Sequence, residues 1–137
     1  MIKEVGKFIE LKTSFVIGKN LYIGHRLPTS KLRCQVVLES GGGKPYFDLP
    51  ERIDKPIQII SRAETYFDAR NDAWEIFDAL ITNHPYGSAG WTLPIVVVGK
   101  EYEALTIDAI ADPQYIGQDE KGRFEFSTNY IFKIRKK

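Results

Sequence analysis

"PIQIISRAETYFDARNDAWEIFDALITNHP", residues 56–85, is the stretch that decides how this chain folds. It opens with apolar and polar side chains in the alternation of a half-buried strand, which predicts a β-strand over residues 56–64. The period then changes to that of one helix face, with apolar side chains at Tyr66, Ala69, Ala73, Ile76, Phe77 and Leu80. Residues 61–64 ("SRAE") have the form of a capping box, and His84 and Pro85 mark the end of the helix. A strand leading directly into an amphipathic helix is therefore the centre of the predicted fold.

The predicted helix carries a second apolar row beside the first, at Phe67, Trp74 and Ile81. A helix that lies on one sheet needs only one such stripe. The surplus predicts that one row packs on the sheet of the same chain and that the other meets a neighbouring molecule.

The N-terminal half supplies further elements. Residues 2–16 predict a short amphipathic helix, with Gly6 counting against it. Residues 20–27 and 33–40 predict two strands joined as a hairpin. Residues 40–56 hold three glycines and three prolines and are predicted to form a loop.

The C-terminal part predicts two more hairpins. Residues 93–98 and 102–112 are strands that flank a short Gly-containing turn, and residues 113–118 precede the terminal strand. Asp119 and Gly122 suit the first and fourth positions of a type I turn between these last two strands. In the terminal strand the even-numbered residues from Phe124 to Ile134 are expected to pack, and the odd-numbered residues, Ile131 apart, are expected to face water.

The predicted order is α-β-β-β-α-β-β-β-β, without the repeated βα alternation of a parallel sheet. It indicates an α+β fold in which an antiparallel (mixed) β-sheet has two α-helices packed against it. With 137 residues the chain is predicted to form a single domain, residues 1–137.

Composition excludes several classes of protein. The formal net charge of +1 gives no strong field that would draw the chain onto nucleic acid or a membrane. The longest apolar stretch is too short to span a bilayer, and charges interrupt the N-terminal segment, so no signal peptide is expected and the protein is cytosolic where it is made. Cys34, the only cysteine, is predicted to be a small buried hydrophobe.

No catalytic, cofactor-binding or metal-binding motif is found. The glycines at 41–43 lack the residues that a phosphate-binding loop requires, and His25 and His84 have no second ligand at metal-binding spacing. Four acidic residues gather loosely around the last two hairpins: Asp108, Asp112, Asp119 and Glu120. They match no catalytic spacing, and we interpret them as turn and surface residues.

Two pieces of the sequence carry a family resemblance: "DLPERIDKPIQIISRAETYFDARNDAWEIFDAL" (48–80) and "IGQDEKGRFEFSTNYIF" (116–132). Together with "NLYIGHRLP" (20–28) after an N-terminal helix, they resemble the minor capsid and tail terminator (tail completion) proteins of long-tailed bacteriophages and prophages. The resemblance implies a structural protein, not an enzyme, that needs no cofactor. Family members form a ring, typically a hexamer, that caps the tail tube, halts its polymerisation and presents a docking surface for the head connector.

The resemblance also implies partners and a location. The partners would be other copies of the chain, the tail tube protein and the head–tail connector or stopper protein, with DNA only as passing cargo. The protein would occupy the head-proximal end of the tail in the virion, and the host cytoplasm during assembly. Candidate interface residues are Gly42, Lys44, Tyr46, Trp74, Tyr86, Trp91, Asp119 and Arg123. For Trp91, anchoring of its own loop is an equally good interpretation.

Three alternatives stay open at this point. The first is a head-completion or connector adaptor. The second is a small metal-dependent enzyme that uses Asp108, Asp112 and Asp119. The third is a nucleic-acid-binding module that uses the basic C-terminal cluster around Lys133 and Arg135.

Overall fold

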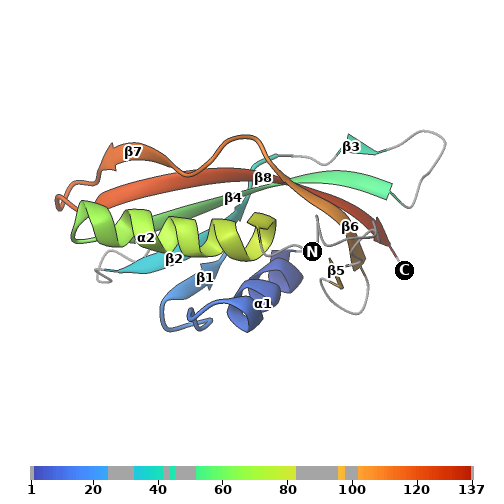
Figure 1. Cartoon of the computed structure of the whole chain (residues 1–137), viewed down its shortest axis with the longest axis horizontal. Helices are drawn as coiled ribbons and strands as arrows, with labels where there is room; N and C mark the ends of the chain where they lie inside the picture. The colour runs from blue at the N-terminus through green and yellow to red at the C-terminus, as the bar shows by residue number, and fades with distance from the viewer. Residues whose placement is uncertain are drawn as a thin grey trace.

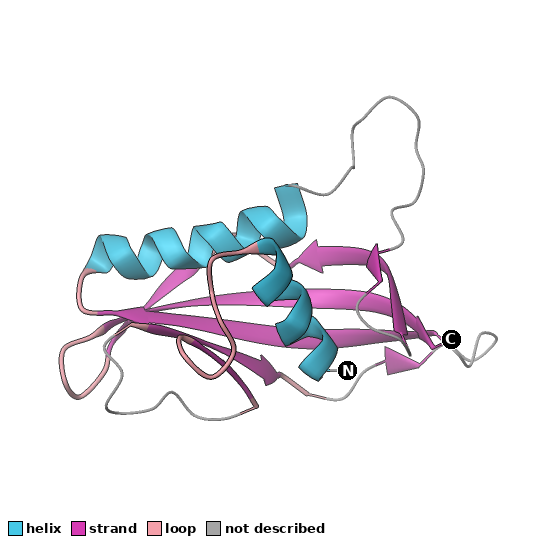
Figure 2. Cartoon of the chain, turned by 90° about the horizontal axis from the view of Figure 1, so that it is seen from below, coloured by secondary structure: helices cyan, strands magenta, loops and turns pink. Residues whose placement is uncertain are grey.

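A computed structural model describes residues 2–24, 33–41, 44–45, 52–82, 96–97 and 102–136. Two helices pack on one mixed sheet, as the sequence predicts (Figure 1). Helix α1 spans Ile2–Lys12 and helix α2 spans Tyr66–Phe77, continued by a π-helical turn over Asp78–Thr82. Figure 2 shows α2 lying along the long strands, with α1 beside its C-terminal half.

The described strands run in the order β1-β2-β4-β8-β6-β5, with β3 paired to β4 and β7 paired to β8. Their bounds are Leu21–Ile23 (β1), Cys34–Glu39 (β2), Lys44–Pro45 (β3), Arg52–Ala63 (β4), Val96–Val97 (β5), Tyr102–Ala109 (β6), Gln114–Gln118 (β7) and Phe124–Lys136 (β8). The predicted element order is confirmed, with the two-residue β3 in addition. Both predicted C-terminal pairings, β5 with β6 and β7 with β8, are also confirmed and antiparallel.

Strand β8 is the main support of the sheet. It pairs with β4 along its whole length, from Ala63↔Phe124 to Arg52↔Arg135, and its other side pairs first with β7 and then with β6. Its even-numbered face is buried as predicted: Tyr130 and Phe132 are fully buried in the core. The same cluster contains Val5 and Ile9 of α1, Ile76 of α2, Leu80, and Ile57 and Ile59 of β4. Both helices therefore pack on the same face of the sheet.

The prediction that the odd-numbered face of β8 stays in water is wrong at two positions. Arg123 and Ser127 are both buried. The Ser127 hydroxyl accepts a hydrogen bond from Nε2 of Gln58 at 2.9 Å, and Arg123 pairs with Asp119. Polar groups can be buried here because each has a partner, and the alternation of the sequence does not show this.

The predicted hairpin between residues 20–27 and 33–40 is also wrong, because β1 and β2 are parallel. Leu21 pairs with Gln35, and Ile23 with Val37. The chain turns back before β1, where the backbone N–H of Leu21 donates to the carbonyl of Val16 at 3.1 Å. An apolar pattern defines a strand but not its direction, so the sequence could not separate the two arrangements.

The boundaries around β4 and α2 differ from the prediction. Residues 52–56 were predicted to be loop, yet they belong to β4. Pro56 is tolerated in β4 because it lies just past the last paired residue of β2, Glu39. Its carbonyl accepts a hydrogen bond from the backbone N–H of Ser40. A backbone N–H at Pro56 would point toward Ser40 as well, so its absence breaks no pairing within β2. The N-cap of α2 is Thr65, whose Oγ1 accepts from the Asp68 N–H at 3.2 Å, whereas Ser61 lies within β4, so the capping box at 61–64 does not form. His84 and Pro85 lie outside the described residues.

Candidate assembly interface

The tip of the β7–β8 hairpin is organised by one carboxylate. Asp119 Oδ1 accepts the backbone N–H of Lys121 at 3.0 Å and that of Arg123 at 2.8 Å. Its Oδ2 accepts from Nε of Arg123 at 2.7 Å, and its carbonyl accepts the Gly122 N–H at 3.0 Å. Gly122 has a φ of 77°, which suits glycine. The predicted turn, with Asp119 at its first position and Gly122 at its fourth, is therefore confirmed, and the Asp119 carboxylate is its internal anchor.

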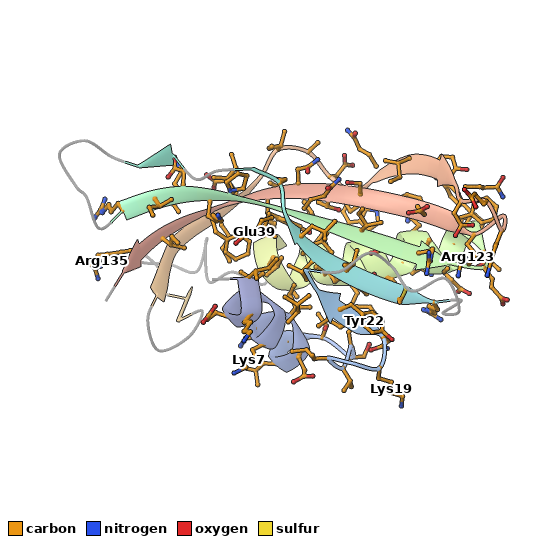
Figure 3. All side chains as sticks on the ribbon, turned by 180° about the vertical axis from the view of Figure 1, so that it is seen from behind. Lys7, Lys19, Tyr22, Glu39, Arg123 and Arg135 are labelled. Atoms are coloured by element: carbon orange, nitrogen blue, oxygen red, sulfur yellow. The ribbon has the colours of Figure 1, made fainter. Side chains whose placement is uncertain are left out.

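A second arginine reaches the same carboxylate from the middle of the sheet. Arg62 Nη1 lies 3.5 Å from Asp119 Oδ2, and Nη2 of the same side chain lies 3.7 Å from Sγ of Cys34. Arg62, Asp119 and Arg123 line an open cavity of about 580 Å³ on the helix-free face. Its other lining residues are Val36, Leu38, Ile60, Gln118, Glu120, Lys121 and Glu125. Figure 3 shows this face, with Arg123 at the hairpin end and Arg135 at the other.

The cluster has a defined electrostatic character. Burial by itself would raise the pKa of Asp119, but the hydrogen bonds from Arg123 and Lys121 outweigh it and hold that pKa below its usual value. Burial raises the pKa of Glu125, only partly offset by the positive charge of Arg62. Burial likewise raises the pKa of the Cys34 thiol, which keeps it protonated at neutral pH. Cys34 is fully buried, as the sequence predicts.

This arrangement stabilises a hairpin and contains no nucleophile with an adjacent base. Among the residues that the structure describes, no group of three or more His, Cys, Asp or Glu side chains could hold a metal ion. The Asp108 carboxylate instead forms an ion pair with Lys133 at 3.4 Å, and the Asp119 carboxylate forms one with Arg123 at the turn.

Exposed aromatic side chains gather on the helix side of the same hairpin. Phe67 is 69% exposed, Tyr115 46% and Tyr66 36%. The Tyr66 ring lies 5.4 Å from Tyr115 and 5.1 Å from Phe126 between centroids, in edge-on geometry. Ile116, on β7, is also 54% exposed. We call Tyr66, Phe67, Tyr115 and Ile116 the aromatic end. A rigid, partly exposed aromatic cluster of this kind is typical of a protein–protein interface.

Comparison with known protein families agrees with an assembly role. A family model described as bacteriophage tail terminator protein matches residues 8–136, which is almost the whole chain. The chain belongs to the bacteriophage tail terminator family. No curated protein matches the sequence of this tail terminator. In the described parts of the chain, no helix is long and apolar enough to cross a membrane.

The structure of the tail terminator places four of the predicted interface residues. Asp119 and Arg123 are brought together, but Arg123 is only 4% exposed, so its guanidinium holds the hairpin. Trp74 is half-buried between Phe77, at 5.1 Å between ring centroids, and the guanidinium of Arg70, 5.6 Å away. Lys44 lies in β3. The remaining four lie outside the described residues: Gly42, Tyr46, Tyr86 and Trp91.

Sequence reasoning missed most of the aromatic end. It assigned Tyr66 to the packed stripe of α2 and did not single out Tyr115 or Ile116. No local pattern marks the last two, because the register of β7 against β8 shifts between Tyr115 and Gly117. Phe67 was identified correctly as part of the surplus apolar row of the helix.

Proposed function

We propose that this tail terminator forms a ring, a hexamer by the family resemblance, that caps the phage tail tube. The ring stops polymerisation of the tube and provides the surface on which the head connector docks. The observation that carries the proposal is the family match over residues 8–136. The role is structural, and no catalytic step is assigned to the protein.

The exposed aromatic end supports an assembly role. The rings of Tyr66 and Tyr115 are already held by packing against Phe124 and Phe126 of β8, so they lose little side-chain freedom when a partner covers them, and Phe67 packs edge-on against Tyr66. The partners that we propose are other copies of the chain, the tail tube protein and the head–tail connector. The proposed location is the head-proximal end of the tail in the virion.

Two measurements test the proposal. The first is mass by light scattering across a concentration series, with negative-stain imaging of any large species. The second is the length of tubes polymerised from the tube protein of the same phage, with and without this protein. We expect rings, and tubes whose growth stops once the protein is added.

A protein that stays monomeric at every concentration and leaves tube growth unchanged would contradict the proposal. If it instead bound the head connector but never the tube, the adaptor function would replace it. For a matched control, the same assays use Asn129→Ser, a change at an exposed residue on the helix-free face.

A further inference from the structure

In the part of the chain that the structure describes, the large exposed hydrophobic side chains gather on two sides of the molecule. Among the described residues, the large ones at one edge of the sheet are Leu11, 78% exposed, and Val16, 46% exposed, in α1 and the turn beside β1. All the others belong to the opposite edge. They are the four residues of the aromatic end and Ile110, which joins β6 to β7 and is 68% exposed. Figure 1 shows α1 and β1 on one side of the long strands and β7 on the other.

The two edges also differ in charge. On α1 and the following turn, the fully exposed charged residues are all lysines: Lys3, Lys7, Lys12 and Lys19. Figure 3 labels two of them, Lys7 and Lys19, projecting from this side. The acidic residues of the segment are half-buried, and Glu10 is engaged with the backbone N–H of Ile17 at 2.6 Å. We call Leu11, Val16 and these four lysines the α1 edge.

Around the opposite edge and the N-terminal end of α2, the exposed acidic residues are Glu64, Asp112 and Glu120. Two basic residues share this edge, Arg70 and Lys121. The Arg70 guanidinium lies over the Trp74 ring and keeps its charge, so exposed acidic residues exceed basic ones here by three to two.

We propose that the α1 edge of one copy of this chain packs against the aromatic end of the next copy. This inference rests on the proposed ring and names its contact surfaces. A ring closes by repeating one heterologous contact, which requires two different and complementary patches on different sides of each subunit. The two patches meet that requirement: each has exposed apolar side chains, the α1 edge is strongly basic while the aromatic end has a small acidic excess, and they lie on different sides of the subunit, one at α1 and β1 and the other at β7 and the start of α2.

Disulfide cross-linking tests the contact directly. Cys34 is the only cysteine and is fully buried, so Leu11→Cys and Phe67→Cys introduce thiols into a background without an exposed one. We expect a mixture of the two single variants to form a cross-linked dimer on mild oxidation. A chain that carries both substitutions should form a ladder of larger species. The matched control combines Leu11→Cys with Asn129→Cys, which lies on the helix-free face.

Two further variants test the chemistry of the contact. Phe67→Ser should raise the concentration needed for ring formation about tenfold or more, as loss of a central aromatic anchor does, whereas Asn129→Ser should not change it. Lys7→Glu with Lys12→Glu should weaken association roughly three- to tenfold, and Glu64→Lys with Glu120→Lys in the same chain should restore it. All four sites are exposed, so the fold of each variant can be verified by its unchanged unfolding midpoint.

The readouts separate this inference from the proposed function. Rings together with the Leu11–Phe67 cross-link support both. Rings with no such cross-link, or with cross-linking equal to that of the Asn129 control, overturn the contact and leave the ring standing. Absence of association in solution and on tube ends overturns both.

Discussion

Gly6 provides the sharpest test of how α1 is attached to the sheet. The residue is buried within the helix, and a Cβ built on it would lie 2.7 Å from Cγ1 of Ile23 and closer still to its Cδ1. Such distances are too short for real carbon atoms, so Gly6→Ala forces the Ile23 side chain or the helix to move. Alanine also favours the helix by about 1 kcal/mol relative to glycine. Overpacking costs about 1–3 kcal/mol. We therefore expect Gly6→Ala to lower the free energy of unfolding by up to about 2 kcal/mol.

A double-mutant cycle separates the two effects. Ile23→Ala removes both atoms that oppose the new Cβ. In that background Gly6→Ala should stabilise the protein by roughly 0.5–1 kcal/mol, because only the helix-propensity gain is left. The coupling between the two sites is then about 1–3 kcal/mol, the cost of overpacking, and lies within the range seen for contacting residues.

The assay is urea unfolding followed by circular dichroism for the wild type, both single variants and the double variant. A thermal melt of the same samples is a second readout. There Gly6→Ala should lower the unfolding midpoint by a few degrees, since about 1 kcal/mol shifts Tm by roughly 4 °C in a chain of this size. Equal effects of Gly6→Ala with and without Ile23 would refute the close approach of α1 to β1. Stabilisation of the wild type by Gly6→Ala would refute it as well.

Three other predictions concern polar groups that are held by the fold. Asp72→Asn should destabilise the protein by about 2–3 kcal/mol, because the Asp72 carboxylate accepts hydrogen bonds from Nε and Nη2 of Arg33 at 2.8 and 2.7 Å and from Nε2 of Gln35 at 3.0 Å. Chemical denaturation measures this loss, and Asn71→Ala, at an exposed neighbour, is the control that should change the stability little. Cys34 should react with iodoacetamide slowly in the folded protein and rapidly in urea, because burial keeps its thiol covered and raises its pKa; equal rates in the two states would contradict this. Asp119 has a folded-state pKa below the ordinary 3.8, so its contribution to stability is complete above that pH and is lost as the pH falls through the lower folded value. Asp119→Asn should therefore flatten the acid limb of a stability curve measured between about pH 2 and pH 6, and an unchanged limb would show that the carboxylate does not anchor the turn.

Periodicity predicted the elements whose burial is one-sided. Strand β8 and helix α2 each pack one apolar face into the core, and the period of that face is visible in their sequences. The start of β4 was hidden because Arg52, Asp54 and Lys55 interrupt the alternation before Pro56. The parallel pairing of β1 with β2 depends on where the chain travels between them, which no local pattern records.

The candidate site was less predictable for a similar reason. Turn chemistry identified Asp119, and its spacing of four from Arg123 placed the two within reach. The burial of Arg123 and the approach of Arg62 depend on strand pairing between residues about 60 positions apart, which sequence alone does not give. The aromatic end also depends on contacts between distant parts of the chain. Tyr66 of α2 and Tyr115 of β7 meet only when both pack beside β8.

The position of β8 has a consequence for when the protein can fold. It is the last of the described strands to be synthesised, yet it lies inside the sheet, with β4 on one side and β6 and β7 on the other. Until residues 124–136 leave the ribosome, β4 lacks one neighbour and the rings of Phe124 and Phe126 are not available to Tyr66 and Tyr115. Folding therefore waits for pairings between distant parts of the chain, which makes it slow relative to locally connected folds. The same delay means that a chain still lacking residues 124–136 has no completed aromatic end, so by the contact proposed above it could not yet join a ring.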